Sequence, residues 1–322
     1  MSDITNSPNT SSSNSNSDSS YIFGPVPSRR LGRSLGIDIT PYKTCTFDCV
    51  YCQLGRTTEK TVQRREYVPK DLVLSELERF LNKNEGDIDC ITFAGSGEPT
   101  LHSKIGEMID AIKTMTDIPV VVITNGSLLF LEDVRNDLMN TDLVLPSLDA
   151  ATTQGFRAVD QPHESLKIGQ IVEGLRIFKE AFEGKFWLEI MIVKGLNDSD
   201  DEISALTDAV SRIGPDRVQL NTVVRPSMED VEAASRSEMM GLCERFTESL
   251  GHGGNVEIIA DARIWVRADI LPLIERRPLT IDEISDALQV HRNEAAKYLR
   301  ELEVRGEVVE MMHEGKRYFT RR

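Results

Sequence analysis

The stretch Thr44-Cys-Thr-Phe-Asp-Cys-Val-Tyr-Cys-Gln-Leu-Gly55 decides how the rest of the chain is interpreted. It holds Cys45, Cys49 and Cys52 at CxxxCxxC spacing, and no other Cys or His lies within thirty residues on either side. A tetrahedral structural zinc needs four ligands, usually supplied in pairs. A cubane iron–sulfur cluster also normally takes four cysteines, so three leave one iron open to bind a reactant. The loop therefore indicates a polynuclear centre with an open iron. The alternative is a zinc knuckle or three buried cysteines.

This loop, including Tyr51 before the third cysteine, resembles the signature of the radical S-adenosylmethionine (radical SAM) superfamily. The resemblance implies a 4Fe-4S cluster on Cys45, Cys49 and Cys52. Its open iron would chelate the amino and carboxylate groups of S-adenosyl-L-methionine (SAM). The resemblance also implies reductive cleavage of SAM to a 5′-deoxyadenosyl radical, an oxidoreductase chemistry. The electron would come from an external donor of the flavodoxin or ferredoxin type.

Composition predicts a globular cytoplasmic protein. The chain has 322 residues, with 52 acidic and 37 basic side chains and a formal net charge of −15. This charge favours solubility and argues against an extended surface that binds polyphosphate. Local basic patches remain compatible with it. No apolar run approaches a membrane span, and the N-terminus lacks the regions of a signal peptide. Five cysteines, an odd number, fit a reducing cytosol better than a disulfide scaffold.

Three segments differ in composition. Residues 1–20 are mostly Ser and Asn and are predicted to be disordered, because they cannot bury enough apolar surface to order the chain. Residues 21–260 alternate short apolar runs with amphipathic helical patterns. Residues 261–322 read as a separate small domain.

The central segment predicts an α/β fold with a parallel sheet, because strand–helix units in strict alternation favour right-handed crossovers. Six units are too few for a closed eight-stranded barrel, and periodicity does not separate an open barrel from a doubly wound sheet. The radical SAM resemblance implies the partial (β/α)6 TIM-like barrel. The predicted strands are Ser34–Thr40, Cys90–Ala94, Pro119–Thr124, Leu143–Ser147, Phe186–Val193 and Arg217–Thr222, and the predicted helices include Leu72–Leu81, Ile105–Met115, Leu166–Phe182 and Glu202–Ile213. Ser199 with Glu202 is read as a capping box at the last of these helices.

The C-terminal segment resembles a winged helix-turn-helix domain. Its pattern predicts a helix over Ala262–Ile274, a helix opened by a Thr280–Glu283 capping box, a third helix ending at Gly306, and a hairpin of Glu307–Met311 with Arg317–Arg321. Cations of the third helix and the wing could contact nucleic acid. Residues 271–322 nevertheless hold ten bases and ten acids, which leaves protein docking or a structural lid as alternatives.

The turn Gly95-Ser-Gly-Glu-Pro-Thr100 follows the second predicted strand. Gly95 and Gly97 let the backbone approach a ligand closely, and Glu98 places a carboxylate at the carboxyl edge of the sheet. Alone, such a turn is as consistent with a tight connection as with a ligand-binding turn. It is similar to the Gly-Gly-Glu-Pro element of radical SAM proteins, which meets the methionine amino group. Ser96 stands where that element has its middle glycine, so the backbone contact could differ in detail.

Polar residues also follow the next strands. Asn125, Ser147 with Asp149, and Asn197 end the third, fourth and fifth strands, and Asn221 is a weaker case after the sixth. Each could be a turn or helix cap. Together they are what a SAM ribose and carboxylate would need at the edge where barrel enzymes keep their site.

Two further groups have simpler interpretations. Arg29, Arg30 and Arg33 precede the first strand and are either an anion contact or solvated loop charges. Cys90 and Cys243 lie in an apolar strand and a helical stretch, where they are expected to be small buried hydrophobes. We therefore expect no auxiliary cluster.

From Phe23 to about Pro226 the pattern resembles the radical SAM branch that contains the tRNA wyosine synthases. Those relatives hold a second cluster on cysteines before the radical SAM triplet, whereas Cys45 is the first cysteine here. The main hypothesis is a radical SAM enzyme acting on an RNA base, with RNA as a possible partner. The alternatives are an enzyme acting on a protein or small molecule, and a winged-helix regulator that senses its cluster.

Overall fold

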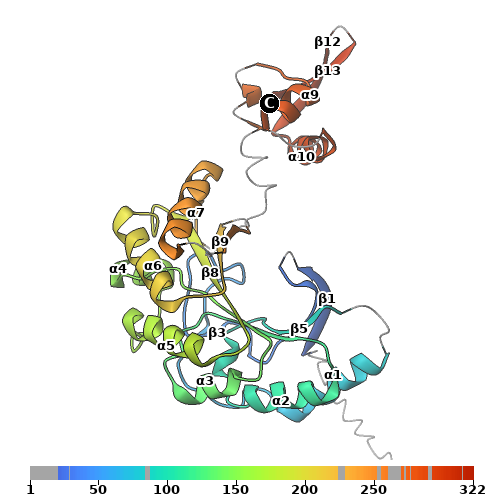
Figure 1. Ribbon diagram of the computed structural model, residues 1–322. Coiled ribbons are helices and arrows are strands. Elements are labelled where there is room, and N and C mark those ends of the chain that lie inside the picture. Colours follow the sequence, from blue (N-terminus) through green and yellow to red (C-terminus); the bar gives the residue numbers. More distant parts are fainter. Residues whose placement is uncertain are drawn as a thin grey trace, which may run out of the picture.

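The computed structural model of the chain describes an α/β sheet with helices packed outside it and a small C-terminal unit (Figure 1). The N-terminal twenty residues predicted to be disordered, and Arg29, lie outside the described residues. The described residues are 21–28, 30–83, 88–223, 229–251, 255–259, 270–271, 273–275, 277–288, 292–313 and 315–322.

The main sheet is parallel along its whole path except at its first strand. β1 is antiparallel to β2, and every later neighbour pair on the path is parallel. In spatial order the strands are β1 (Ile22–Ser28), β2 (Gly32–Ile37), β5 (Cys90–Phe93), β6 (Val120–Thr124), β7 (Leu143–Pro146), β8 (Lys185–Lys194), β9 (Arg217–Thr222) and β11 (Val256–Ile258). The short β10 (Glu232–Ala233) pairs with β8 off this path, and β3 (Thr44–Cys45) pairs with β4 (Glu59–Lys60) in the loop after β2.

The strand order separates the two folds that periodicity left open. A doubly wound sheet reverses its strand order at a switch point, whereas β2, β5, β6, β7, β8, β9 and β11 follow one another in sequence order. Right-handed crossovers in a constant direction put all helices on one face, and the sheet curls as an open barrel with edges at β1 and β11. The helices are α1 (Lys70–Lys83), α2 (Ile105–Met115), α3 (Glu132–Leu138), α4 (Thr153–Val159), α5 (Ile168–Ala181), α6 (Asp200–Ile213) and α7 (Arg236–Leu250), with a 3-10 turn η1 (Pro99–Leu101).

All six predicted strands are present, and their bounds differ by up to three residues. The first, predicted as Ser34–Thr40, is Gly32–Ile37, and the last matches at both ends. β1 and β11 were missed. β1 reads Ile-Phe-Gly-Pro-Val-Pro-Ser, and two prolines suppress a strand prediction although prolines are tolerated on an edge strand such as this one. β11 has only three residues.

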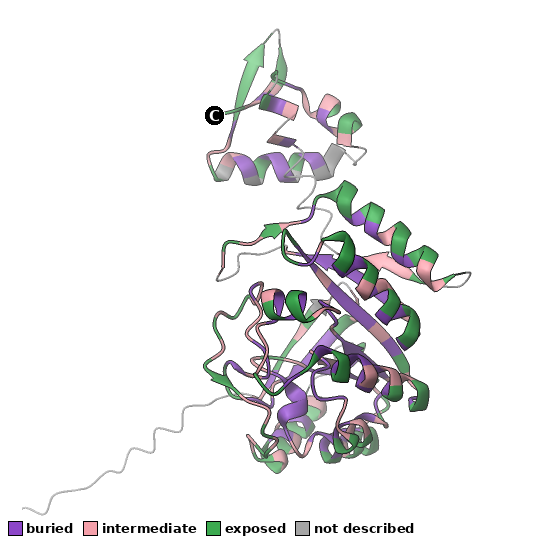
Figure 2. Cartoon of the chain, turned by 90° about the vertical axis from the view of Figure 1, so that its left-hand side faces the viewer, coloured by how far each residue is buried: buried purple, intermediate pink, exposed green. Residues whose placement is uncertain are grey.

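Helix–sheet packing forms the main core, which Figure 2 shows as buried colouring in the strands and on the inner faces of the helices. Phe178 of α5 illustrates it. Its ring is fully buried, 4.7 Å from the Phe182 ring and 6.0 Å from the Phe186 ring of β8. α5 therefore presents an aromatic contact to the strand that follows it.

The predicted capping box at α6 is only half correct. The Ser199 hydroxyl accepts from the Glu202 N–H at 3.3 Å, as an N-cap should. The Glu202 carboxylate does not return to the cap. It accepts from the backbone N–H groups of Ala151 and Thr152 at 2.5 and 3.0 Å, so it ties the loop after β7 to α6.

The C-terminal unit has its own cluster of buried residues, including Ile284, Tyr298, Leu299 and Phe319. Its described elements follow the predicted order of helix, helix and hairpin, and the Thr280–Glu283 capping box is complete. The helix predicted over Ala262–Ile274 lies mostly outside the described residues. The winged helix assignment stays a prediction. The elements are α9 (Ile281–Leu288), α10 (Arg292–Val304), β12 (Val308–His313) and β13 (Lys316–Arg321).

Replacement of Phe178 by Ala should lower the free energy of unfolding by about 3–5 kcal/mol, because a buried aromatic ring is lost and a cavity remains. Urea unfolding followed by far-UV circular dichroism measures the change. Ile177→Ala is the matched control on the same helix, because Ile177 is 36% exposed. Equal losses for the two variants would contradict the packing described for α5.

Candidate cofactor site

The cysteine loop follows β2 and is anchored by residues that lie between its three cysteines. Phe47 is buried and packs edge-on against Phe156 of α4, with ring centroids 5.4 Å apart. The Val50 N–H donates to the Val159 carbonyl at 2.9 Å, and the Asp48 N–H donates to the Asp160 carbonyl at 3.0 Å. The end of α4 therefore holds the loop at the carboxyl edge of the sheet, although it is more than a hundred residues away in sequence.

The Gly95–Pro99 turn lies directly against the cysteine loop. The Lys43 N–H donates to the Ser96 carbonyl at 2.8 Å, and the Glu98 N–H donates to the Thr44 carbonyl at 3.1 Å. A Cβ on Gly97 would lie 2.0 Å from that same Thr44 oxygen, so only glycine permits the approach. Ser96 does not face the loop with its side chain, because its hydroxyl donates to Asp38 at 2.5 Å.

Glu98 connects this turn to the end of β6 through hydrogen bonds of its carboxylate. Its side chain is 2% exposed. Oε1 accepts from the Thr100 N–H and from the hydroxyls of Thr100 and Thr124, at 3.0, 2.6 and 2.6 Å. Oε2 accepts from the Asn125 N–H at 2.8 Å. Burial raises the pKa of Glu98, while these donors favour the charged form. These four hydrogen bonds hold the turn in place. Oε2, which accepts one of them, can accept a further hydrogen bond.

Two side-chain donors reach the cysteine sulfurs. The Asn125 amide donates to Cys45 Sγ at 3.5 Å and to the Thr46 hydroxyl at 2.7 Å. The Lys43 ammonium lies 3.0 Å from Cys52 Sγ. Lys43 is 3% exposed and has a φ of 55°, an uncommon backbone state for a residue with a side chain. Such backbone states often accompany functional sites.

The segment after β7 contributes a buried acid. Asp149 accepts from the Tyr51 hydroxyl and, at 2.8 Å, from the Met191 N–H, so it links the cysteine loop to β8. Burial raises the pKa of Asp149 to about 7. Asn197 is fully buried, and its amide donates to the carbonyls of Asp149 and Met191 at 2.7 Å each. Its contacts join two strand ends rather than facing a ligand.

The three thiols suit a positively charged iron centre. All three are free and partly exposed. Burial, followed by the nearby Glu98 carboxylate, raises the pKa of Cys45 to about 12, and burial also raises the pKa of Cys49 well above its usual value. Binding as thiolates therefore releases protons and needs compensating metal charge. Among the described residues no three His, Cys, Asp or Glu side chains surround a single ion position. A cubane does not require one, since each thiolate binds a different iron.

The remaining predicted residues lie elsewhere or are already paired. Ser147 is half-buried at the end of β7, beside Glu189. Arg30 is neither solvated nor free for an anion, because it pairs with Glu189. The Arg33 N–H donates to Asp89 at 2.6 Å. Cys90 is buried near Val121 and Leu143, and Cys243 packs partly buried against the main core.

The sequence analysis missed Lys43, Asp38 and Asp160. Lys43 could have been noticed, because it stands two residues before Cys45 in the sequence. Asp160, whose carboxylate lies 3.6 Å from Cys49 Sγ, has no such signal, since 111 residues separate the two.

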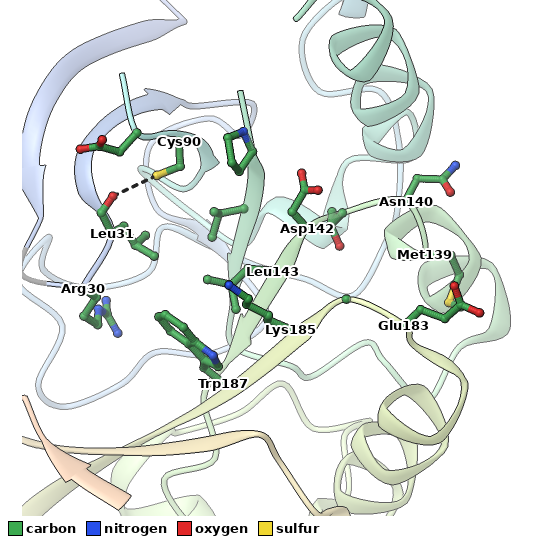
Figure 3. A pocket seen from close by; sticks show the side chains of 15 residues that line it. Arg30, Leu31, Cys90, Met139, Asn140, Asp142, Leu143, Glu183, Lys185 and Trp187 are labelled. Carbon is green, nitrogen blue, oxygen red and sulfur yellow. Dashed lines mark hydrogen bonds between the residues drawn. The ribbon is translucent and has the colours of Figure 1, made fainter. Parts of the chain in front are cut away.

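A cavity of about 790 Å³ opens at the opposite, N-terminal ends of the strands. Figure 3 shows Arg30, Cys90, Lys185 and Trp187 around it. None of the predicted cofactor residues lines this cavity. Catalytic groups of such barrels gather at the carboxyl ends, so the cysteine edge is the candidate site.

The sequence profile of the Radical SAM superfamily matches residues 39–206, just over half of the chain. The match contains the cysteine loop and the Gly95–Pro99 turn. The chain belongs to the radical SAM superfamily. It is therefore an enzyme of this class, and its family works with a 4Fe-4S cluster, SAM and an external reductant.

Several known proteins are similar to this radical SAM chain. UPF0026 protein MJ1312 of Methanocaldococcus jannaschii is 34% identical over 310 residues, which cover 93% of this chain and 95% of that one. A Brachyspira hyodysenteriae protein named GTPase Obg is 39% identical over 300 residues, but the chain spans only 44% of its length. The dual-specificity RNA methyltransferase RlmN of a Caulobacter species is 24% identical over 218 residues, covering 61% of this chain and 50% of that one.

Solved structures agree with the fold. A radical SAM methyltransferase from Sphaerobacter thermophilus superposes with a TM-score of 0.52 at 15% identity, covering 70% of this chain and 66% of that one. This likeness concerns the fold alone. Among the described residues no helix combines the length and apolarity needed to cross a bilayer.

Gly97→Ala should abolish or strongly reduce iron loading, because its Cβ would meet the Thr44 carbonyl and separate the turn from the cysteine loop. Iron and sulfide per chain after anaerobic reconstitution measure this. Gly241→Ala is the control, since a Cβ at Gly241 meets nothing within 4 Å. Full loading of the Gly97 variant would show that the close approach is dispensable.

Lys43→Gln should lower the midpoint potential of the cluster on the order of 100 mV, because a buried positive charge beside a ligand favours the reduced state. A redox titration followed by electron paramagnetic resonance measures it. Lys60→Gln removes an exposed charge from the adjacent β4 and should shift the potential much less. Similar shifts in both variants would contradict a specific role for Lys43.

Proposed function

We propose that Cys45, Cys49 and Cys52 hold the 4Fe-4S cluster, with SAM bound at the neighbouring strand ends. When bound, the reduced cluster and SAM supply a 5′-deoxyadenosyl radical. The observation that carries the proposal is the direct contact between the cysteine loop and the Gly95–Pro99 turn through Thr44 and Gly97. Two motifs that are far apart in sequence thus form one surface.

The chain's own residues have distinct tasks in this proposal. Lys43 and Asn125 donate toward ligand sulfurs and orient the thiolates. The Gly95-Ser96-Gly97 backbone offers a polar edge for the methionine amino group. Glu98 fixes that edge and keeps acceptor capacity on Oε2. The remaining SAM contacts are proposed for Asn125 and Ser147, while Asp149 and Asn197 act by positioning β7 and β8.

An RNA base is the proposed substrate. Support comes from the similarity to the RNA methyltransferase RlmN. It also comes from polar side chains that face one another from neighbouring strands. Asn221 of β9 donates to Glu189 of β8 at 2.9 Å, and Gln219 donates to Glu257 at 2.6 Å. Amide and carboxylate groups match the donor and acceptor edges of a base, which would replace these mutual hydrogen bonds on binding. The C-terminal unit is proposed as a winged helix that helps to hold the RNA.

The electron is proposed to come from a flavodoxin- or ferredoxin-type carrier in the cytoplasm. Cys52 is partly exposed and lies two residues before Leu54, which is 41% exposed. A carrier that docks over this side would have a short path to the cluster.

Anaerobically reconstituted, dithionite-reduced protein should convert SAM to 5′-deoxyadenosine, and Cys49→Ala should lose essentially all turnover because one iron loses its ligand. Liquid chromatography quantifies the product. Cys90→Ala is the matched control, because Cys90 lies apart from the loop. Undiminished turnover in the Cys49 variant would refute the ligand assignment.

A further inference from the structure

A basic groove lies beside the cysteine loop. It is a cavity of about 600 Å³ lined by Lys60 of β4, Arg157 of α4 and Lys167 at the start of α5, with a floor that includes Phe156 and Leu166. All three cations are exposed, and the two floor residues are buried. In a chain with a net charge of −15, such a concentration of positive charge needs an explanation.

The three cations differ from nearby ones in their pairing. Arg56 pairs with Asp48 and Glu229, and Arg64 pairs with Asp133 and Asp137. In the part of the chain that the structure describes, no carboxylate forms an ion pair with Lys60, Arg157 or Lys167. The Lys60 ammonium donates to the Gln161 carbonyl at 2.9 Å. Among the described residues that line the groove, Glu164 is the one with an acidic side chain. The cations are therefore available to an anion.

The groove is coupled to the cofactor site at two points. Lys60 lies opposite Cys45 in the β3–β4 pairing. The His163 N–H, on the far wall, donates to the Thr46 carbonyl at 2.8 Å. An anion held in the groove would therefore lie next to the loop that carries the predicted cluster ligands.

We propose that this groove binds a backbone phosphate of the RNA substrate. The inference rests on the proposed function and adds the place where the polynucleotide is held. Arg157 offers the planar fork that matches phosphate oxygens, and the two lysines add point charges. The N-terminal end of α5 lies in the same groove and adds a favourable dipole, with open space at Gly169. The apolar floor suits the sugar next to the phosphate.

The shape argues against an acidic protein as the occupant. A stable protein interface needs roughly 800 Å² of surface from each partner. The groove is instead concave and of the size that takes a single small group. A phosphate with its sugar fills such a site without a flat surrounding surface.

The test uses the full-length reconstituted protein and fluorescently labelled, unfractionated tRNA, with anisotropy read over a series of KCl concentrations. The Arg157→Gln/Lys167→Gln double variant should bind about tenfold more weakly at low salt, because two charged hydrogen-bond donors are lost. Its slope of log K against log salt should fall in magnitude by roughly 0.7 to 0.9, since one phosphate contact is lost. Iron content and the thermal midpoint show that the variant is folded and loaded.

The matched control is Lys113→Gln/Arg212→Gln, which removes two cations from outer helices and should leave both affinity and slope unchanged. Equal behaviour of the two double variants overturns the groove assignment while leaving the RNA substrate in place. Wild-type protein that does not bind tRNA at low salt overturns the RNA substrate itself.

Two further arms identify other occupants. Direct binding of adenosine 5′-monophosphate by wild type but not by the groove variant, with tRNA affinity equal in both, would assign the groove to a small phosphorylated molecule. If reduced flavodoxin reduces the cluster of the groove variant more slowly than that of wild type, with unchanged tRNA binding, the groove would be assigned to an acidic carrier protein. Either result overturns the proposal.

Discussion

The contact between Gly97 and the Thr44 carbonyl is the constraint on which the site depends. It brings the turn after β5 against the loop after β2 with no room for a side chain. Glu98 then carries the connection onward, because its carboxylate binds Thr124 and Asn125 at the end of β6. Asn125 returns to Cys45 and Thr46, which closes a ring of contacts around the cysteine loop. The loop is thus positioned from three strand ends, and a change at one of them should be felt at the others.

Much of this arrangement follows from the sequence, because it depends on local signals. Cysteine spacing, a glycine turn after a strand and alternating strand–helix patterns are all short-range, and they predicted a site at the carboxyl edge of the sheet, where the structure brings the cysteine loop and the Gly95–Pro99 turn together. The strand order needed the structure, since periodicity carries no information about which strands are neighbours. Roles of single polar residues were harder still. Glu202 was predicted as a capping residue but binds the Ala151–Thr152 backbone, and Arg30, predicted as an anion contact or a solvated charge, pairs with Glu189. Both partners are distant in sequence.

Charge is distributed unevenly over this acidic chain. Many described cations, such as Arg56, Arg64 and Arg176, are paired with a carboxylate, which in solvent contributes little to stability. Lys43 is different, because it is buried against a cysteine sulfur, and a buried ammonium is costly unless a negative group faces it. The thiolates of a bound cluster would supply that negative group. Such thiolates would offset part of the cost of burying Lys43, which would couple cofactor binding to local stability.

The open edge of the sheet bears on the size of the substrate. The described strands end at β1 on one side and β11 on the other, so the barrel is not closed by hydrogen bonds between them. Arg30 nonetheless reaches from the β1–β2 turn to Glu189 of β8, and its guanidinium lies 3.4 Å from Gln219 of β9. A side-chain bridge can open at much lower cost than a strand ladder, because it involves two groups rather than a row of backbone hydrogen bonds. A base carried on a polynucleotide could enter a closed barrel through its carboxyl end only together with its flanking backbone. An edge closed only by side chains leaves a path along which an extruded base could reach the interior while its phosphates stay outside.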